Sequence, residues 1–156
     1  MLLPHFPGSA LPTPDAEFLR SWWRDGDAGP WAHRPSFAVS DVPHVRAALG
    51  PERARLAYPW AALAEAGARL LAGTDYPIEV LEPLAGLARL VSGRSDRDGF
   101  RTPDIAPPHS RLAPGDAFRV MSDERAGHTV LSADPRAVPA GEIDRIEVLG
   151  TSPVPF

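Results

Sequence analysis

The chain has 156 residues, of which 44% are hydrophobic and 23% are charged, and this is the composition of one globular domain with enough apolar residues for a core. Its net charge of −4 is spread along the chain without a basic stripe, so we expect no nucleic-acid partner. Cysteine and lysine are both absent, which excludes disulfides, thiolate metal sites, Schiff bases and a carboxylated lysine that bridges two metal ions.

The start of the chain has no basic segment followed by an apolar run, and no stretch approaches the roughly 18 apolar residues of a membrane span. We therefore expect a cytoplasmic protein that does not contact a membrane.

Residues 1–34 are predicted to form a proline-rich arm followed by a helix. Thr13-Pro14-Asp15 has the capping hydroxyl, early proline and early acid that favour a helix start, and Gly26 ends the apolar pattern.

Residues 35–125 alternate between strand and helix patterns. A short strand is expected at 35–41, and Asp41 is expected to cap a helix that ends at Gly50. Further helices are expected after Pro51 and over 60–66, and the apolar run 68–72 is typical of a buried parallel strand. Helices starting at Pro83 and Pro114 flank a polar loop over 94–108.

Residues 126–156 are predicted to form a C-terminal β segment. Its strands are expected at 128–131 and 145–149, and alternation in the second places Ile146 and Val148 on one side.

Asp75 is the candidate functional residue, because the motif Gly73-Thr74-Asp75 follows the predicted parallel strand. In α/β folds, ligands and catalytic groups collect at the carboxyl ends of parallel strands. A carboxylate there is suited to hold a divalent metal and to take a proton from water. The alternative from the residues alone is a turn or helix cap, in which Asp is also common.

A wider set of segments resembles the end of an amidohydrolase barrel, in the branch of D-aminoacylase-like and N-substituted-formamide-deformylase-like enzymes. The similar segments are residues 35–41, 49–54, 58–60 with Leu63, 66–70, 73–77, 83–87, 111–117, 129–135, 138–139 and 142–143.

This resemblance implies an α/β fold that is the C-terminal fragment of a TIM (β/α) barrel, consisting of its last one or two βα units over 35–125. A short β tail from an accessory β-domain, over 126–156, would follow it. In the family, the strand that ends in Gly-Ser/Thr-Asp is the eighth of the barrel, and its aspartate binds metal and acts as general base. Carried over, this makes Asp75 both the metal and the catalytic residue, with zinc as the expected divalent metal and no other cofactor.

Several family features have no counterpart here. The first-strand His-x-His pair and the histidines of the fifth and sixth strands lie upstream of the matched segments, and His5 lacks the acidic neighbour of a sixth-strand ligand. His33-Arg34 stands where Val-Gln commonly precedes the Pro-Ser of the pattern. His44, His109 and His128 lack short ligand spacing, so we expect surface or structural roles for them.

Three hypotheses follow. The first is a metal-dependent hydrolase of carbon–nitrogen bonds in small non-peptide amides, present as a C-terminal portion that is inactive alone. The second is a non-catalytic or complementing subunit that pairs with a separately encoded N-terminal half, or with copies of itself. The third is a small α/β binding module in which Gly-Thr-Asp is coincidental.

Overall fold

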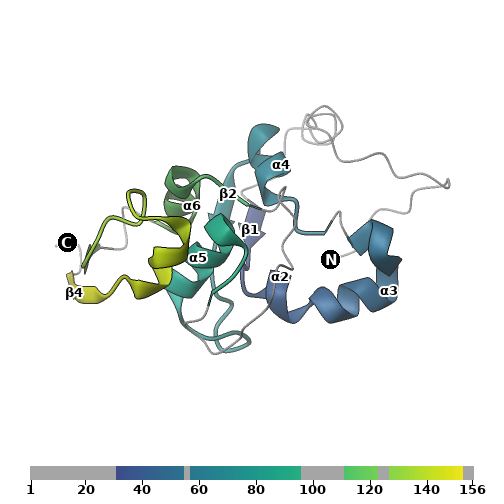
Figure 1. Cartoon of the computed structure of the whole chain (residues 1–156), viewed down its shortest axis with the longest axis horizontal. Helices are drawn as coiled ribbons and strands as arrows, with labels where there is room; N and C mark the ends of the chain where they lie inside the picture. Colours follow the sequence, from purple (N-terminus) through teal and green to yellow (C-terminus); the bar gives the residue numbers. More distant parts are fainter. Residues whose placement is uncertain (1–30, 55–56, 96–110, 123–126, 153–156) are drawn as a thin grey trace.

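The computed structural model describes residues 31–54, 57–95, 111–122 and 127–152 (Figure 1). The predicted helix after Thr13, most of the loop over 94–108, and His5 and His109 lie outside the described residues. In chain order the elements are β1 (Trp31–His33), α2 (Phe37–Ser40), α3 (Val42–Ala54), α4 (Trp60–Glu65), β2 (Leu70–Ala72), α5 (Pro83–Ser92), α6 (Pro114–Met121), β3 (His128–Leu131), the 3-10 helix η2 (Ala140–Arg145) and β4 (Val148–Ser152).

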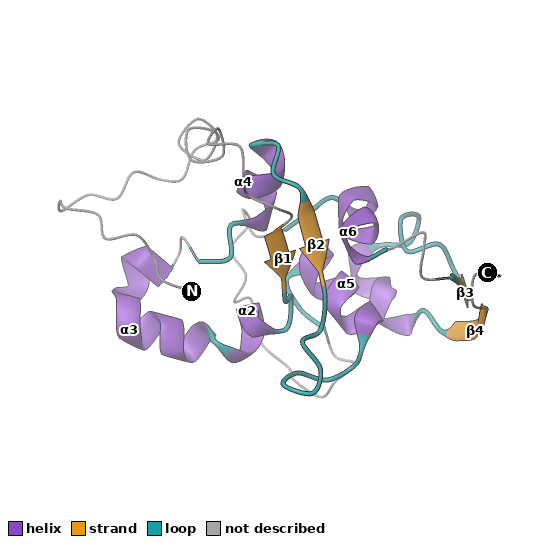
Figure 2. Ribbon diagram, turned by 180° about the vertical axis from the view of Figure 1, so that it is seen from behind, coloured by secondary structure: helices purple, strands orange, loops and turns teal. Residues whose placement is uncertain are grey.

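Two short strands, β1 and β2, form a parallel pair, and in Figure 2 their arrows point the same way. The register pairs Trp31 with Leu70 and His33 with Ala72, so both strands end at the same edge. The predicted parallel strand over 68–72 is therefore confirmed. Leu70 is buried, whereas Leu71, which points to the opposite face, is 39% exposed.

The strand predicted at 35–41 is wrong, because the chain turns there and enters a helix. Phe37 N–H donates to the Arg34 carbonyl oxygen at 3.0 Å, which closes a tight turn through Pro35 and Ser36. Proline has the backbone angle that the second position of such a turn requires. Ser40 N–H then bonds the Ser36 carbonyl at 3.1 Å, and α2 follows. The strand of this region is β1, immediately before the turn.

Glycine and proline divide the connection between the two strands as predicted. Gly50 has φ 75° and ψ 164° inside α3, so the helix before it ends there and a second helical piece starts at Pro51. Pro59 precedes α4, and Gly67, at φ 88°, ends the turn after it. Asp41 directly precedes α3, but its carboxylate bonds the Tyr58 hydroxyl, which is not the helix-capping role that we predicted.

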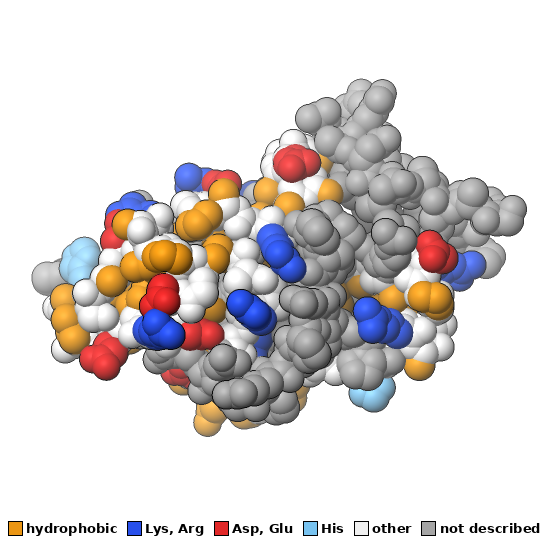
Figure 3. Space-filling model, in the orientation of Figure 1, with side chains coloured by type: hydrophobic (Ala, Val, Ile, Leu, Met, Phe, Trp, Pro, Cys, Tyr) orange, Lys and Arg blue, Asp and Glu red, His pale blue; other side chains and the backbone are white. Residues whose placement is uncertain are grey.

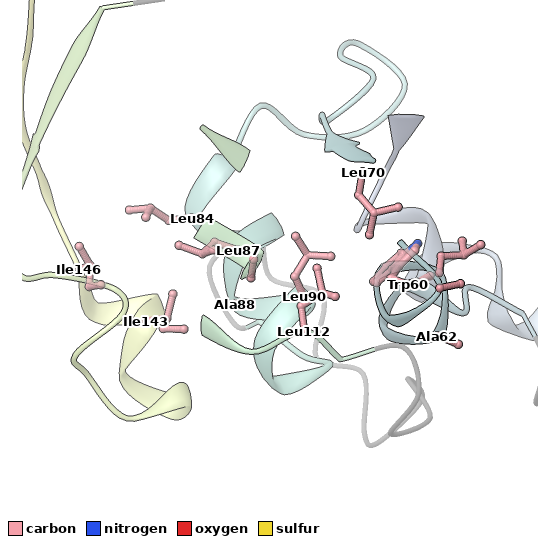
Figure 4. Packing of buried hydrophobic residues seen from close by; sticks show 14 residues of the cluster. Trp60, Ala62, Leu70, Leu84, Leu87, Ala88, Leu90, Leu112, Ile143 and Ile146 are labelled. Atoms are coloured by element: carbon pink, nitrogen blue, oxygen red, sulfur yellow. The ribbon is translucent and has the colours of Figure 1, made fainter. Parts of the chain in front are cut away.

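The hydrophobic core is centred on α5. The apolar spacing in the sequence predicts a core-facing stripe of Leu84, Leu87, Ala88 and Val91; the first three are buried and Val91 is partly buried. Helix α5 packs on η2 and on α6, while α6 and α4 contact β2. Figure 4 shows Ile143 and Ile146 facing α5 on one side and Trp60 and Leu70 meeting on the other. This packing fixes the helical layer against one face of the β1–β2 pair.

The C-terminal strands β3 and β4 form an antiparallel ladder, and the predicted strand at 128–131 is confirmed. The strand predicted over 145–149 is wrong in its bounds, because β4 spans Val148–Ser152. The prediction that Ile146 and Val148 lie on the same side is also wrong. Ile146 N–H bonds the Ile143 carbonyl at 3.2 Å at the end of η2, and a bulge at Val130/Leu131 pairs Leu131 with Val148, where β4 begins. Ile146 is consequently 2% exposed and Val148 52% exposed.

The ladder exposes apolar side chains, which Figure 3 shows gathered at the end of the molecule that carries β4. Val130, Val148 and Leu149 are all more than half exposed.

The described elements mix helices with short strands, and their origin in a (β/α) barrel stays a prediction. Among the described helices, none combines the length and apolar character needed to cross a membrane.

Candidate functional site

The carboxyl edge of the β1–β2 pair brings two charged side chains together. Arg34 directly follows β1, and Asp75 lies three residues after β2. The guanidinium Nε of Arg34 lies 2.8 Å from Asp75 Oδ2, and both side chains are partly exposed, at 43% and 35%. Asp75 thus lies at the strand edge where sequence analysis placed it, and its side chain faces the neighbouring strand exit.

Asp75 has an unusual backbone conformation, with φ at 61°. This left-handed region costs an L-residue about 1 kcal/mol or more, although Asp and Asn adopt it more readily than most. Two contacts hold the local chain: Ile78 N–H donates to the Asp75 carbonyl at 2.9 Å, and Tyr76 N–H donates to Thr74 Oγ1 at 3.3 Å. Backbone strain held in this way is common at functional sites.

Arg34 is held by the turn after β1 and by a buried bond beneath that turn. Arg89 of α5 is 2% exposed, and its Nη1 donates to Ser36 Oγ at 3.0 Å. Ser36 is itself 6% exposed. Hydrogen bonds from a charged donor are stronger than neutral ones, especially away from water. The turn that positions Arg34 is therefore fixed to the helical layer.

The loop after β2 is joined to α2 by a second contact. Ser40 Oγ donates to Glu79 Oε1 at 2.7 Å. The same loop exposes three large apolar side chains, Tyr76, Ile78 and Leu81, each by more than 60%. The loop that carries Asp75 therefore also carries exposed apolar side chains.

A hydrogen bond between Tyr58 and Asp41 connects the two ends of the segment between α2 and α4. Tyr58 Oη donates to Asp41 Oδ2 at 2.8 Å, and the ring of Tyr58 meets Trp60 edge-on with centroids 5.9 Å apart. Burial raises the pKa of the Tyr58 hydroxyl well above its ordinary value of 10.0, and the bond to Asp41 raises it further. Because the hydroxyl donates to Asp41 and the ring packs against Trp60, we assign Tyr58 a structural role.

The described residues do not form a metal site on their own. No cluster of three or more His, Cys, Asp or Glu side chains suited to a metal ion occurs in the described part of the chain. Asp75 is one candidate protein ligand, and the Oδ2 oxygen of its carboxylate already contacts a guanidinium. A catalytic metal takes about three protein ligands. His44 and His128 are both exposed, in line with the surface roles expected for them.

With this geometry in view, comparison with protein families identifies the class. The model of the amidohydrolase family matches residues 26–133, and the chain belongs to that family. The match covers β1, the connection to β2, Asp75, α5 and α6. This membership supports a hydrolase and disfavours the unrelated binding module.

A curated relative agrees. Over 134 residues the chain is 27% identical to a Bacillus subtilis (strain 168) protein named "Putative amidohydrolase YtcJ". The aligned region is 76% of this chain and 25% of that protein, so the chain spans about a quarter of the length of the relative that it matches. No solved structure matches significantly.

The sequence pattern indicates Asp75 but not Arg34, Ser36 or Arg89 as parts of the same edge. Arg34 stands out in the sequence as a departure from the family pattern. A strand that ends at His33 puts Arg34 at the carboxyl edge, whereas the expected strand over 35–41 starts after Arg34. Arg89 was hidden because a helical arginine is ordinarily exposed.

Proposed function

We propose that this chain is the C-terminal portion of a metal-dependent amidohydrolase that cleaves carbon–nitrogen bonds in small non-peptide amides. The observation that carries the proposal is the position of Asp75, whose carboxylate lies at the carboxyl edge of two adjacent parallel strands. Family membership supports the hydrolase class. The D-aminoacylase-like and N-substituted-formamide-deformylase-like branch is part of the proposal, on the strength of the segments that resemble it.

In this proposal β1 and β2 are the last two strands of a (β/α) barrel, and α5 is the helix that follows the final strand. Barrel active sites lie at the carboxyl ends of the strands, which is the edge that Arg34 and Asp75 occupy. A barrel of this kind requires about 250 residues, more than this chain has. We therefore infer that the isolated chain is inactive.

Asp75 is proposed as the general base, which accepts a proton from the attacking water as the amide carbonyl is hydrolysed. It is also the proposed protein ligand, from this chain, for a divalent ion such as zinc. The described residues contribute one ligand to such a centre, and the others would come from outside them.

A second candidate is a complementing or non-catalytic subunit that docks on an N-terminal half. The exposure of Leu71 on the face of β2 away from Leu70, and of Val130 and Leu149 on the β3–β4 ladder, favours it. Exposed apolar strand surface is usually covered by further structure. Docking and catalysis are compatible, since a docked chain would also deliver Asp75.

The test is complementation. The full chain is purified alone and after co-expression with a polypeptide that carries the remaining part of the Bacillus subtilis relative, and both are assayed on small N-acyl and N-formyl amides with added zinc. The proposal predicts a stable complex that hydrolyses amides and an isolated chain that does not. Complex formation without turnover would favour the non-catalytic subunit, and hydrolysis by the isolated chain would refute the incomplete-enzyme proposal.

A further inference from the structure

The carboxylate that the proposed function requires as a metal ligand is already neutralised within the chain. Arg34 Nε approaches Asp75 Oδ2 to 2.8 Å, so a full positive charge lies in contact with one of the two carboxylate oxygens. A divalent ion bound to Asp75 would lie within a few ångströms of this guanidinium.

Arg34 is placed for this contact by several interactions. Its carbonyl accepts from Phe37 N–H, and its guanidinium carbon lies 5.8 Å from the centroid of the Phe37 ring. A cation over an aromatic face is attracted to the ring. Beneath it, the bond from Arg89 to Ser36 fixes the turn from the helical side. Moving the side chain away from Asp75 would disturb both the ion pair and the ring contact.

Asp75 is equally constrained. Its φ of 61° and the bond that its carbonyl accepts from Ile78 limit the directions in which the side chain can project. The backbone therefore presents the Asp75 side chain from a defined position beside Arg34.

Electrostatics decides what this contact does to metal binding. Repulsion between a guanidinium and a divalent ion is twice that between two single charges at the same distance, and water screens it incompletely at a partly buried site. The contrary effect, in which Arg34 helps by orienting the carboxylate, saves only the small rotamer entropy of an aspartate. Repulsion is the larger of the two.

We propose that Arg34 is an internal counter-ion that takes the place of a divalent ion at Asp75, so that the chain excludes metal from this carboxylate until Arg34 is displaced. The inference rests on the proposed function, because it assumes that Asp75 is otherwise able to bind metal. It makes Arg34 a regulatory contact and makes its displacement a condition for loading the site.

The test is a titration of the full chain with Mn²⁺, followed by electron paramagnetic resonance of the free ion. Arg34→Gln removes the charge, Arg34→Lys keeps it, and Arg69→Gln is a matched control, because exposed Arg69 directly precedes β2 at its opposite end. Because Asp75 is a single protein ligand among the described residues, Mn²⁺ binding is weak in every variant, and the comparison is one of weak affinities. We expect the affinity of Arg34→Gln for Mn²⁺ to be at least about tenfold higher than that of the wild type. Arg69→Gln and Arg34→Lys should stay within about threefold of the wild type.

Adding Asp75→Asn to Arg34→Gln should remove the gain, which would assign the bound ion to Asp75. Far-UV circular dichroism checks that each variant is folded, and the Arg34 Nε–H resonance of the wild type should shift in Asp75→Asn. Equal affinities of the wild type and Arg34→Gln would overturn the inference, as would a gain that survives Asp75→Asn. Either result is distinct from failure of the proposed function, which is read from amide turnover in the complemented enzyme.

Discussion

Arg89 and Ser36 form a buried hydrogen bond, 3.0 Å from Nη1 to Oγ, that connects the middle of the helical layer to the turn after β1. Because a buried arginine keeps its charge, each acceptor it has in the protein offsets part of its desolvation. This bond supports the turn that presents Arg34 to Asp75.

Ser36→Ala removes this acceptor, and we expect the free energy of unfolding to fall by about 1–3 kcal/mol. Urea denaturation followed by circular dichroism measures the change. Ser122→Ala is the matched control, because the bond that its hydroxyl donates to the Phe118 carbonyl is exposed, and it should change stability by about 0.5 kcal/mol or less. Equal effects of the two substitutions would contradict the importance of the buried bond.

Ile143 is fully buried in the contact between η2 and α5. Truncation to alanine removes apolar contacts and leaves a cavity, so Ile143→Ala should cost about 2–5 kcal/mol. Val130→Ala, at a side chain 57% exposed, provides the comparison and should change stability by less than about 1 kcal/mol. A loss below that level for Ile143→Ala would show that η2 does not pack on α5 as described.

Substitution by alanine should have opposite effects on stability at two glycines with different backbone conformations. Gly67 has φ +88°, so Gly67→Ala should destabilise the protein by about 1 kcal/mol even though no atom lies within 4 Å of the added Cβ. Gly115 lies in α6 with the same open surroundings, and there alanine should stabilise by about 0.5 kcal/mol. Thermal melts that move in the same direction would contradict one of the two backbone conformations.

Asp134 and Arg136 form a tight surface pair, with Oδ2 and Nη2 2.7 Å apart. Hydrogen bonds from the Arg136 side chain and backbone hold the pKa of Asp134 at about 2, below its ordinary 3.8. Since the folded value is depressed, the pair stabilises the fold above about pH 4 and its contribution is lost as pH falls towards 2. Carboxyl chemical shifts measure the pKa, which should return towards 3.8 in Arg136→Ala; no movement would contradict the pairing.

Local patterns predicted the elements whose signals are local, and long-range pairing decided the rest. The apolar stripe of α5, the stop at Gly67 and the parallel character of β2 could be read from spacing and turn chemistry. The strand after residue 34 could not, because Pro35 and Ser36 close a turn within an otherwise apolar run. The strand expected at 145 was displaced by η2 and by the bulge near Leu131, which depends on the partner strand.

Of the residues at the candidate site, one could be predicted from the sequence. Asp75 follows from a strand signal and a glycine-containing motif close to it in sequence. Its contact with Arg34 depends on the register of β1 against β2, which pairs segments far apart along the chain. Neither periodicity nor motif spacing specifies such a register, so the ion pair emerged from the structure alone.

The most direct test of the central claim is the turnover of Asp75→Asn in the complemented enzyme. Loss of a general base lowers the rate by about a hundredfold or more, and we predict a loss of at least that size with the complex intact. Asp116→Asn, which removes a half-exposed carboxylate on α6, should leave turnover unchanged. Full activity of Asp75→Asn would contradict the assignment of this carboxylate to an amidohydrolase active site.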